Sequence, residues 1–185
     1  MPLSEPKSPR KPLHHREIHA RGYKREDGLF DIEGHLHDSK AYDFKVQSGE
    51  RKAGEPVHSM WLRITVDDTL TIVDAEASSD AHPYPGYCGS ITPEYKKLIG
   101  LAIRPGFTNR VRELLGGTEG CTHLTELVGT LATTSFQTMA GQIGQPSDRK
   151  PYQLDRCHAL AVDAPAVAKF YPQWYVPKVP GQGAT

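Results

Sequence analysis

The sequence predicts an α+β fold: an antiparallel β-meander sheet packed on one face by about three helices. Two observations carry this prediction. The first half of the chain contains consecutive segments of alternating apolar and polar residues, joined by short turns. The second half instead places apolar residues at the three-and-four spacing of amphipathic helices. Strands followed by helices are typical of α+β domains, and strands joined by tight turns favour antiparallel pairing.

The composition divides the chain into three parts. Residues 1–15 are rich in proline and basic residues, and we expect a disordered or surface-draped arm. Residues 16–162 carry the periodic segments and form a single α+β domain. Residues 163–185 combine aromatic residues with prolines, which disfavour a regular helix. We expect this segment to be an extended tail through which the chain forms a homo-oligomer.

Two strands flank the turn signal Asp27-Gly28. The second of them has the period of a half-buried strand, with Phe30, Ile32 and Leu36 on one side and Asp31, Glu33, His35 and His37 on the other. We interpret the polar side as an exposed strand face rather than a pair of histidine ligands. Gly34 interrupts the apolar side, which suggests a β-bulge.

A longer strand is predicted from Val57 to Val66. One face carries His58, Met60, Leu62, Ile64 and Val66, and the other carries Ser59, Trp61, Arg63 and Thr65. The turn Asp67-Asp68 leads into a third strand, Leu70–Ala77. Adjacent strands connected in this way form a meander of three or more strands.

Three helices are predicted after the strands. Thr92 and Pro93 are typical of an N-cap and a first helical position, and this helix should end near Gly100. Thr108 is the expected cap of a second helix, which Gly116-Gly117 ends. The third lies within Gly120–Met139, and its apolar face is formed by Leu124, Leu127, Val128, Leu131, Ala132 and Ser135.

Composition excludes several classes of function. Lys and Arg together number 22, as do Asp and Glu, so no overall field attracts nucleic acid or a membrane surface. We find no apolar run that could span a bilayer and no secretory signal, and we expect a cytoplasmic protein. The three cysteines are widely spaced and do not suggest a disulfide framework. Walker and Rossmann glycine patterns are missing, so a nucleotide cofactor is not expected.

The residues with the clearest chemical potential lie at the start of the third helix. Cys121 and His123 occupy a position where the helix dipole favours a thiolate. Cys88 ends a loop that two prolines and a glycine constrain. Three interpretations stay open: a zinc or iron site held by Cys88, Cys121 and His123; a metal-free site with His58 and His123 as acid–base groups; or buried structural cysteines. The cluster His14, His15 and His19 is interpreted as solvated.

Other side chains are candidates for holding a ligand. Arg63 is the best-placed cation for a carboxylate or phenolate, because a guanidinium offers a planar fork of donors. Tyr95 is a second candidate for holding an oxyanion. The aromatic residues Trp61, Tyr84 and Tyr87 are the expected contacts of a small aromatic substrate.

Several blocks of the sequence resemble one bacterial family. They are Gly22-Tyr-Lys-Arg-Glu-Asp-Gly-Leu, Asp31-Ile-Glu-Gly-His-Leu-His-Asp38, Gly54-Glu-Pro-Val-His58-Ser-Met-Trp-Leu-Arg63 and Gly120-Cys-Thr-His-Leu-Thr-Glu-Leu. In this order they look like the family catalogued as domain of unknown function 2889, over roughly residues 16–140. Relatives associated with the breakdown of lignin-derived aromatics make carbon–carbon lyase chemistry the implied activity.

The resemblance and the residues together predict a small lyase. It would remove formaldehyde or carbon dioxide from the side chain of a lignin-derived phenolic compound. His58 or His123 would be the base, and Arg63 or Tyr95 would hold the oxyanion. The site would hold either no cofactor or one transition metal, zinc or iron.

The alternative is a metal- or iron–sulfur-binding scaffold or carrier without turnover. A weaker similarity to iron–sulfur cluster scaffolds supports it, since Cys88 and the pair Cys121 and His123 match their ligand positions. The middle cysteine of those scaffolds has no counterpart between residues 89 and 120.

Overall fold

The computed structural model describes residues 3–142 and 150–178. The chain divides into two compact units, Met1–Gln142 and Ile143–Thr185. The start of the expected arm, residues 1–2, and the end of the expected tail, residues 179–185, lie outside the described residues. Residues 3–13 carry neither helix nor strand and are exposed.

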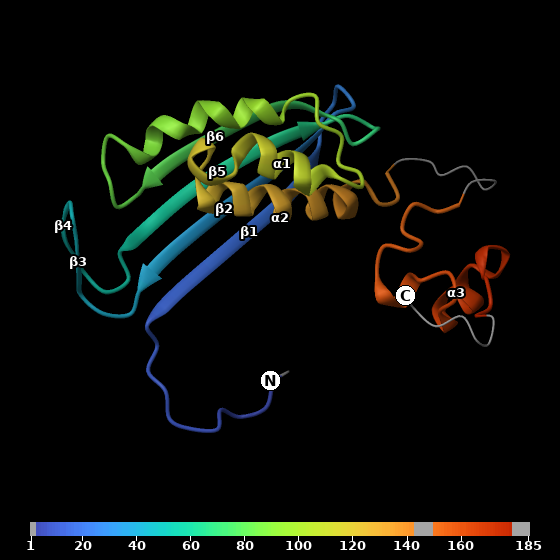
Figure 1. Cartoon of the computed structure of the whole chain (residues 1–185), viewed down its shortest axis with the longest axis horizontal. Coiled ribbons are helices and arrows are strands. Elements are labelled where there is room, and N and C mark those ends of the chain that lie inside the picture. The colour runs from blue at the N-terminus through green and yellow to red at the C-terminus, as the bar shows by residue number, and fades with distance from the viewer. Residues whose placement is uncertain (1–2, 143–149, 179–185) are drawn as a thin grey trace. The chain divides into compact units, whose positions relative to one another are not determined.

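The first unit is built on a four-stranded antiparallel sheet, which confirms the predicted α+β fold and its meander (Figure 1). The strand order β1-β2-β5-β6 follows the chain, and a separate two-stranded hairpin, β3-β4, lies between β2 and β5 in sequence. The strands are β1 (His14–Lys24), β2 (Phe30–Lys40), β3 (Phe44–Val46), β4 (Gly49–Arg51), β5 (Pro56–Val66) and β6 (Ile72–Ala81).

Helices cover one face of this sheet (Figure 1). The helix α2 (Thr122–Met139) packs on β1, β2 and β5, and the 3₁₀ helix Cys88–Leu98 packs on β6. The shorter α1 (Phe107–Leu115) and the 3₁₀ turn Gly117–Glu119 connect them. None of the helices in the described residues is both long and apolar enough to cross a lipid bilayer.

The core lies between α2 and the covered face of the sheet. The predicted apolar face of α2 is confirmed, because all six of its residues are buried. The predicted inward face of β5 is also confirmed, with His58 only partly covered at its edge. The buried sheet residues include Phe30, Ile32, Leu36, Met60, Leu62, Ile64, Val66, Ile72 and Ala75.

Gly34 does not form the predicted bulge. It pairs in regular register with Ala20 on β1 and Leu62 on β5. A Cβ atom at this position would lie 2.8 Å from Cδ2 of Leu131 on α2, which is closer than two non-bonded carbon atoms normally approach. The glycine therefore allows α2 to lie close to β2. The irregularity in the pairing of β2 with β5 falls instead between Asp38 and Ser39.

Two predicted helix starts are wrong. Thr92 and Pro93 lie inside the 3₁₀ helix, and the Thr92 hydroxyl donates backwards to the carbonyl of Gly89. The second helix begins at Phe107 with Gly106 as its N-cap, because φ of 94° at that turn is a conformation that glycine adopts easily. The predicted end of this helix is confirmed, since Gly116 is its C-cap.

The second unit is small, and its buried hydrophobic side chains among the described residues are Leu154 and Val167. It contains α3 (Pro165–Phe170) and the 3₁₀ turns His158–Leu160 and Pro172–Trp174. The segment expected to be extended thus includes one short helix. Pro165 is tolerated there because it occupies the first helical position, where an N–H group would have no helical partner.

Candidate functional site

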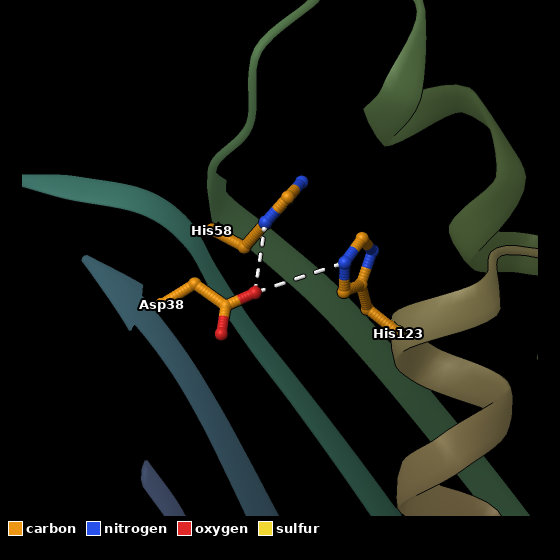
Figure 2. A group of neighbouring side chains, drawn as sticks. All are labelled: Asp38, His58 and His123. Atoms are coloured by element: carbon orange, nitrogen blue, oxygen red, sulfur yellow. Dashed lines mark hydrogen bonds and ion pairs between the residues drawn. The ribbon is translucent and has the colours of Figure 1, made fainter. Parts of the chain in front are cut away.

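Three side chains from separate elements converge at one end of the covered sheet face. Asp38 lies near the end of β2, His58 near the start of β5, and His123 in the first turn of α2. Figure 2 shows the two imidazoles approaching the same carboxylate from β5 and from α2. Nδ1 of His58 lies 3.0 Å from Oδ2 of Asp38, and Nε2 of His123 lies 3.7 Å from the same oxygen.

Asp38 is the buried centre of this cluster, with only 1% of its side chain exposed. Arg16 on β1 holds it with a two-pronged contact, in which Nε donates to Oδ1 at 2.7 Å and Nη2 donates to Oδ2 at 2.8 Å. Nε2 of His14 lies 3.2 Å from Oδ1. Both carboxylate oxygens are therefore held in place by groups of β1, while Oδ2 also faces the histidines.

Positive charge keeps Asp38 ionised. Burial would raise the pKa of this carboxyl group, but the hydrogen bonds and charge of Arg16, with further help from His58 and His14, lower it to about 2. The guanidinium is in turn bound to α2, because Nη1 donates to Oε2 of Glu126 at 2.5 Å. Arg16 thus connects β1, β2 and the first turns of α2.

The two histidines of the cluster lie against each other. Their ring centroids are 3.8 Å apart and the ring planes are inclined by 31°. Burial lowers the pKa of His58, the nearby His123 lowers it further, and the hydrogen bond with Asp38 opposes both effects. The 3.7 Å separation between Nε2 of His123 and Oδ2 of Asp38 is too long for a hydrogen bond.

Cys121 caps the N-terminus of α2 and supports the imidazole of His123. Its sulfur lies 3.9 Å from Nδ1 of His123 and 3.9 Å from Sδ of Met60. Burial would raise the pKa of the thiol, but His123 and the backbone N–H groups at the helix start outweigh burial and lower it.

Tyr95 does not reach the histidines as the predicted oxyanion holder. Its side chain is fully buried, and burial raises the pKa of its phenol. The hydroxyl donates to the carbonyl of Cys121 at 2.9 Å, accepts from the Cys121 N–H at 3.0 Å and lies 2.8 Å from Oγ1 of Thr125. Tyr95 therefore fixes the first turn of α2 instead.

Arg63 and Trp61 lie on the opposite face of the sheet from the cluster. Both line a cavity of about 430 Å³ on that face. The Arg63 guanidinium forms ion pairs with Glu76 and Glu33, so its charge is already balanced. Trp61 stacks on His35 at 4.0 Å between ring centroids. The prediction that Arg63 acts beside His58 is wrong, because odd and even positions of β5 face opposite ways.

The remaining predicted residues do not join the cluster. Tyr84 and Tyr87 are 53% and 79% exposed, on the loop before the 3₁₀ helix. Within residues 3–142 and 150–178, the one set of three or more potential metal ligands consists of Asp38, His58 and His123, whose ligand atoms all lie within 4.8 Å of one another. Neither Cys88 nor Cys121 belongs to it, so the predicted ligand set is wrong for both cysteines.

The sequence-based candidates do not include Asp38 or Arg16; His14 is interpreted there as solvated, and Glu126 is considered, with Asp80 and His82, as a fourth metal ligand. Strand parity is a signal for Asp38, because it continues the apolar side Phe30, Ile32, Leu36 of β2. A carboxylate on the buried side of a strand requires a partner. The identity of that partner depends on the pairing of β1 with β2, which places Arg16 directly across from Asp38.

Comparison with known proteins identifies the family of the chain. A search of curated proteins found no match, and a search of solved structures found none either. The weaker resemblance to iron–sulfur scaffolds thus gains no support. A family model described as "Protein of unknown function (DUF2889)" matches residues 14–137, which run from the first residue of β1 almost to the end of α2 and contain the whole cluster. This match covers more than half of the sequence, and the chain belongs to the DUF2889 family.

Proposed function

We propose that the protein is a small carbon–carbon lyase that removes a one-carbon unit from the side chain of a lignin-derived phenolic compound. The observation that supports it most is the convergence of buried Asp38 with His58 and His123. The two imidazoles are 15% and 24% exposed, so a ligand can reach them although the carboxylate is covered. Groups of this kind, held at one point by the fold, are typical of sites that move protons.

Formaldehyde release defines what such a site must do. The hydroxyl of a hydroxymethyl group loses its proton, the carbon–carbon bond breaks, and the oxygen becomes the carbonyl oxygen of formaldehyde. The electron pair of the broken bond passes into a quinone methide, which forms when the phenol loses an α-hydroxyl group and its phenolic proton together as water. The ring then becomes a phenolate. No oxidant or reductant is consumed. The demanding step is formation of the alkoxide, and the cluster offers the nitrogen and carboxylate groups that promote it.

Formaldehyde is the better supported of the two one-carbon products. Release of carbon dioxide would need a free cation to orient the substrate's carboxylate. Arg16 is the guanidinium of the cluster, and its donors are engaged by Asp38 and Glu126. Arg63 lies on the other face of the sheet, paired with two glutamates. Release of formaldehyde from a neutral hydroxymethyl group does not require a free cation.

The test is an assay of formaldehyde and carbon dioxide over a panel of phenolic lignin dimers that carry a hydroxymethyl side chain. We expect formaldehyde from at least one dimer, and a loss of about 100-fold or more in kcat/KM for Asp38→Asn, His58→Ala and His123→Ala. Matched controls are His35→Ala and Arg63→Gln, on the opposite face of the sheet, which should keep the activity. A panel without any reaction, or cluster variants as active as the controls, would refute the proposal.

A further inference from the structure

We propose that Asp38, His58 and His123 bind one divalent transition-metal ion, through Oδ2, Nδ1 and Nε2 respectively. This inference deepens the proposed function, and the catalytic role of the ion rests on that function. Binding of the ion does not, because it follows from the geometry and charge of the cluster.

The spacing of the three ligand atoms fits an ion. Bonds of about 2.0–2.2 Å to nitrogen and oxygen keep adjacent ligand atoms about 3.0–3.5 Å apart. The two separations from Oδ2 of Asp38 are 3.0 Å to His58 and 3.7 Å to His123, and all three atoms lie within 4.8 Å. The separation to His58 lies within this range, and the separation to His123 exceeds it by about 0.2 Å.

His123 and Asp38 face each other without forming a hydrogen bond. Nε2 of His123 points toward Oδ2 but is too far away to donate a hydrogen bond to it (Figure 2). When Nδ1 donates to the Cys121 sulfur 3.9 Å away, Nε2 presents a lone pair to a negatively charged oxygen. A cation between the two atoms turns this repulsion into two attractive contacts.

The charge of Asp38 is available to such an ion. Arg16 neutralises a carboxylate, but it is shared between Asp38 and Glu126. The three groups together carry one net negative charge, and the two imidazoles are neutral when they act as ligands. A divalent cation is therefore attracted to the cluster even though a guanidinium lies beside it.

The surrounding residues orient the ligands as is usual around a metal. Oδ1 of Asp38 is held by Nε of Arg16 at 2.7 Å and by Nε2 of His14 at 3.2 Å, which directs Oδ2 toward the histidines. The second ring nitrogen of His123 contacts Cys121. Partners of this kind fix the orientation and the tautomer of metal ligands.

The ligand set indicates which chemistry the ion supports. Two imidazoles and one carboxylate suit zinc, iron or manganese and leave coordination positions open. An iron–sulfur cluster would require thiolates, and neither Cys88 nor Cys121 belongs to the set. An open position can take a hydroxyl oxygen, whose proton is then released more easily. The ion would thus promote formation of the alkoxide that the proposed lyase needs.

The experiment measures metal binding by the full chain, independently of turnover. Protein stripped with EDTA is titrated with zinc chloride by calorimetry and with cobalt chloride by visible absorption. We expect one equivalent of each metal per chain, and a loss of affinity of about 100-fold or more in Asp38→Asn, His58→Ala and His123→Ala. His35→Ala and Cys88→Ala are the matched controls and should bind zinc within a few-fold of the parent, since neither residue belongs to the ligand set.

Circular dichroism verifies that each variant is folded. If an alanine variant is not folded, His123→Gln is tested in its place, because His123 lies in the first turn of α2 and is partly exposed. The inference would be overturned if the parent did not bind metal, if all three ligand variants bound it as tightly as the parent, or if Cys88→Ala lost binding. Formaldehyde release by the metal-free parent overturns the catalytic role of the ion and leaves both the lyase and the binding site. One bound equivalent without turnover of any dimer supports the site and refutes the lyase, leaving a metal carrier.

Discussion

His58 lies directly across from Asp38 in the pairing of β5 with β2, and its Nδ1 contacts Oδ2 of Asp38 at 3.0 Å. Arg16 occupies the corresponding position on the other side, across from Asp38 on β1. One row of cross-strand neighbours therefore contains a guanidinium, a carboxylate and an imidazole. The backbone hydrogen bonds of the sheet fix the spacing of these groups. Their relative positions are therefore better defined than those of side chains on loops.

Loss of the Arg16 side chain should destabilise the protein. Arg16→Ala leaves a carboxylate that is 99% buried with only histidine contacts, and we expect the free energy of unfolding to fall by about 2–4 kcal/mol. Urea unfolding measures the change. The matched control is Arg25→Ala, which removes an exposed pair with Asp27 and should lower the free energy of unfolding much less than Arg16→Ala. Equal effects of the two substitutions would contradict the central role of Arg16.

Removal of one hydroxyl group should weaken the start of α2. Tyr95→Phe takes away the hydrogen-bond acceptor of the Cys121 N–H. It also removes one of the contacts of the Cys121 carbonyl and of the Thr125 hydroxyl. We expect a loss of about 1–3 kcal/mol in unfolding free energy, measured by thermal or urea denaturation. Tyr23→Phe, at a side chain that is 44% exposed, serves as the control and should change stability by less than about 0.5 kcal/mol.

Two glycines on facing elements should respond oppositely to alanine. Gly34→Ala places a methyl group 2.8 Å from Leu131 and should destabilise the protein by about 1–3 kcal/mol. Gly129→Ala, within α2, meets open space and should stabilise it by up to about 1 kcal/mol through helix propensity. Urea unfolding of both variants tests the close approach of α2 to β2. An unchanged free energy of unfolding in Gly34→Ala would contradict that approach.

The stability of the fold should decrease in mild acid through His35. Burial lowers the pKa of this imidazole below its usual 6.5, as do His37 and His19, while Asp80 and Glu17 oppose the shift. The unfolded chain therefore binds the proton more readily. The contribution of His35 is fully present above pH 6.5 and is lost as the pH falls through the folded pKa.

Unfolding free energies at about pH 7.5 and about pH 5.5 measure this effect. The decrease between the two values should be smaller in His35→Gln than in the parent. An NMR titration of the His35 ring supplies an independent check, since a folded pKa at or above 6.5 would remove the basis of the prediction.

Periodicity predicts the larger part of this fold. The alternation in β2 and β5 and the apolar face of α2 depend on burial alone, and they are observed as expected. Predictions that depended on local signals were less successful. Gly34 resembles a bulge residue in the sequence, but its role follows from Leu131, which is distant in the chain. Thr92-Pro93 has the residue types of a helix start, but in the structure both residues lie inside a 3₁₀ helix that begins at Cys88.

The candidate site could be predicted in part. His58 and His123 were selected from their positions at the edge of an apolar face and at a helix start, and the structure brings them together. Arg63 is a candidate because of its guanidinium and Cys88 because it ends a constrained loop, but Arg63 lies on the opposite face of the sheet from the histidines. Asp38 shares the parity of the buried residues of β2 but was not recognised. Its partner Arg16 requires the strand register, which no short stretch of sequence specifies.

The meander also has a consequence for the order of folding. Asp38 and His58 meet through a hairpin of neighbouring strands, whereas His123 arrives only when α2 closes a much longer loop. Local pairings form early, and contacts between distant parts of the chain form late. The complete cluster therefore assembles in the last stage of folding. In stopped-flow refolding, recovery of any property that requires all three side chains should lag behind formation of the sheet.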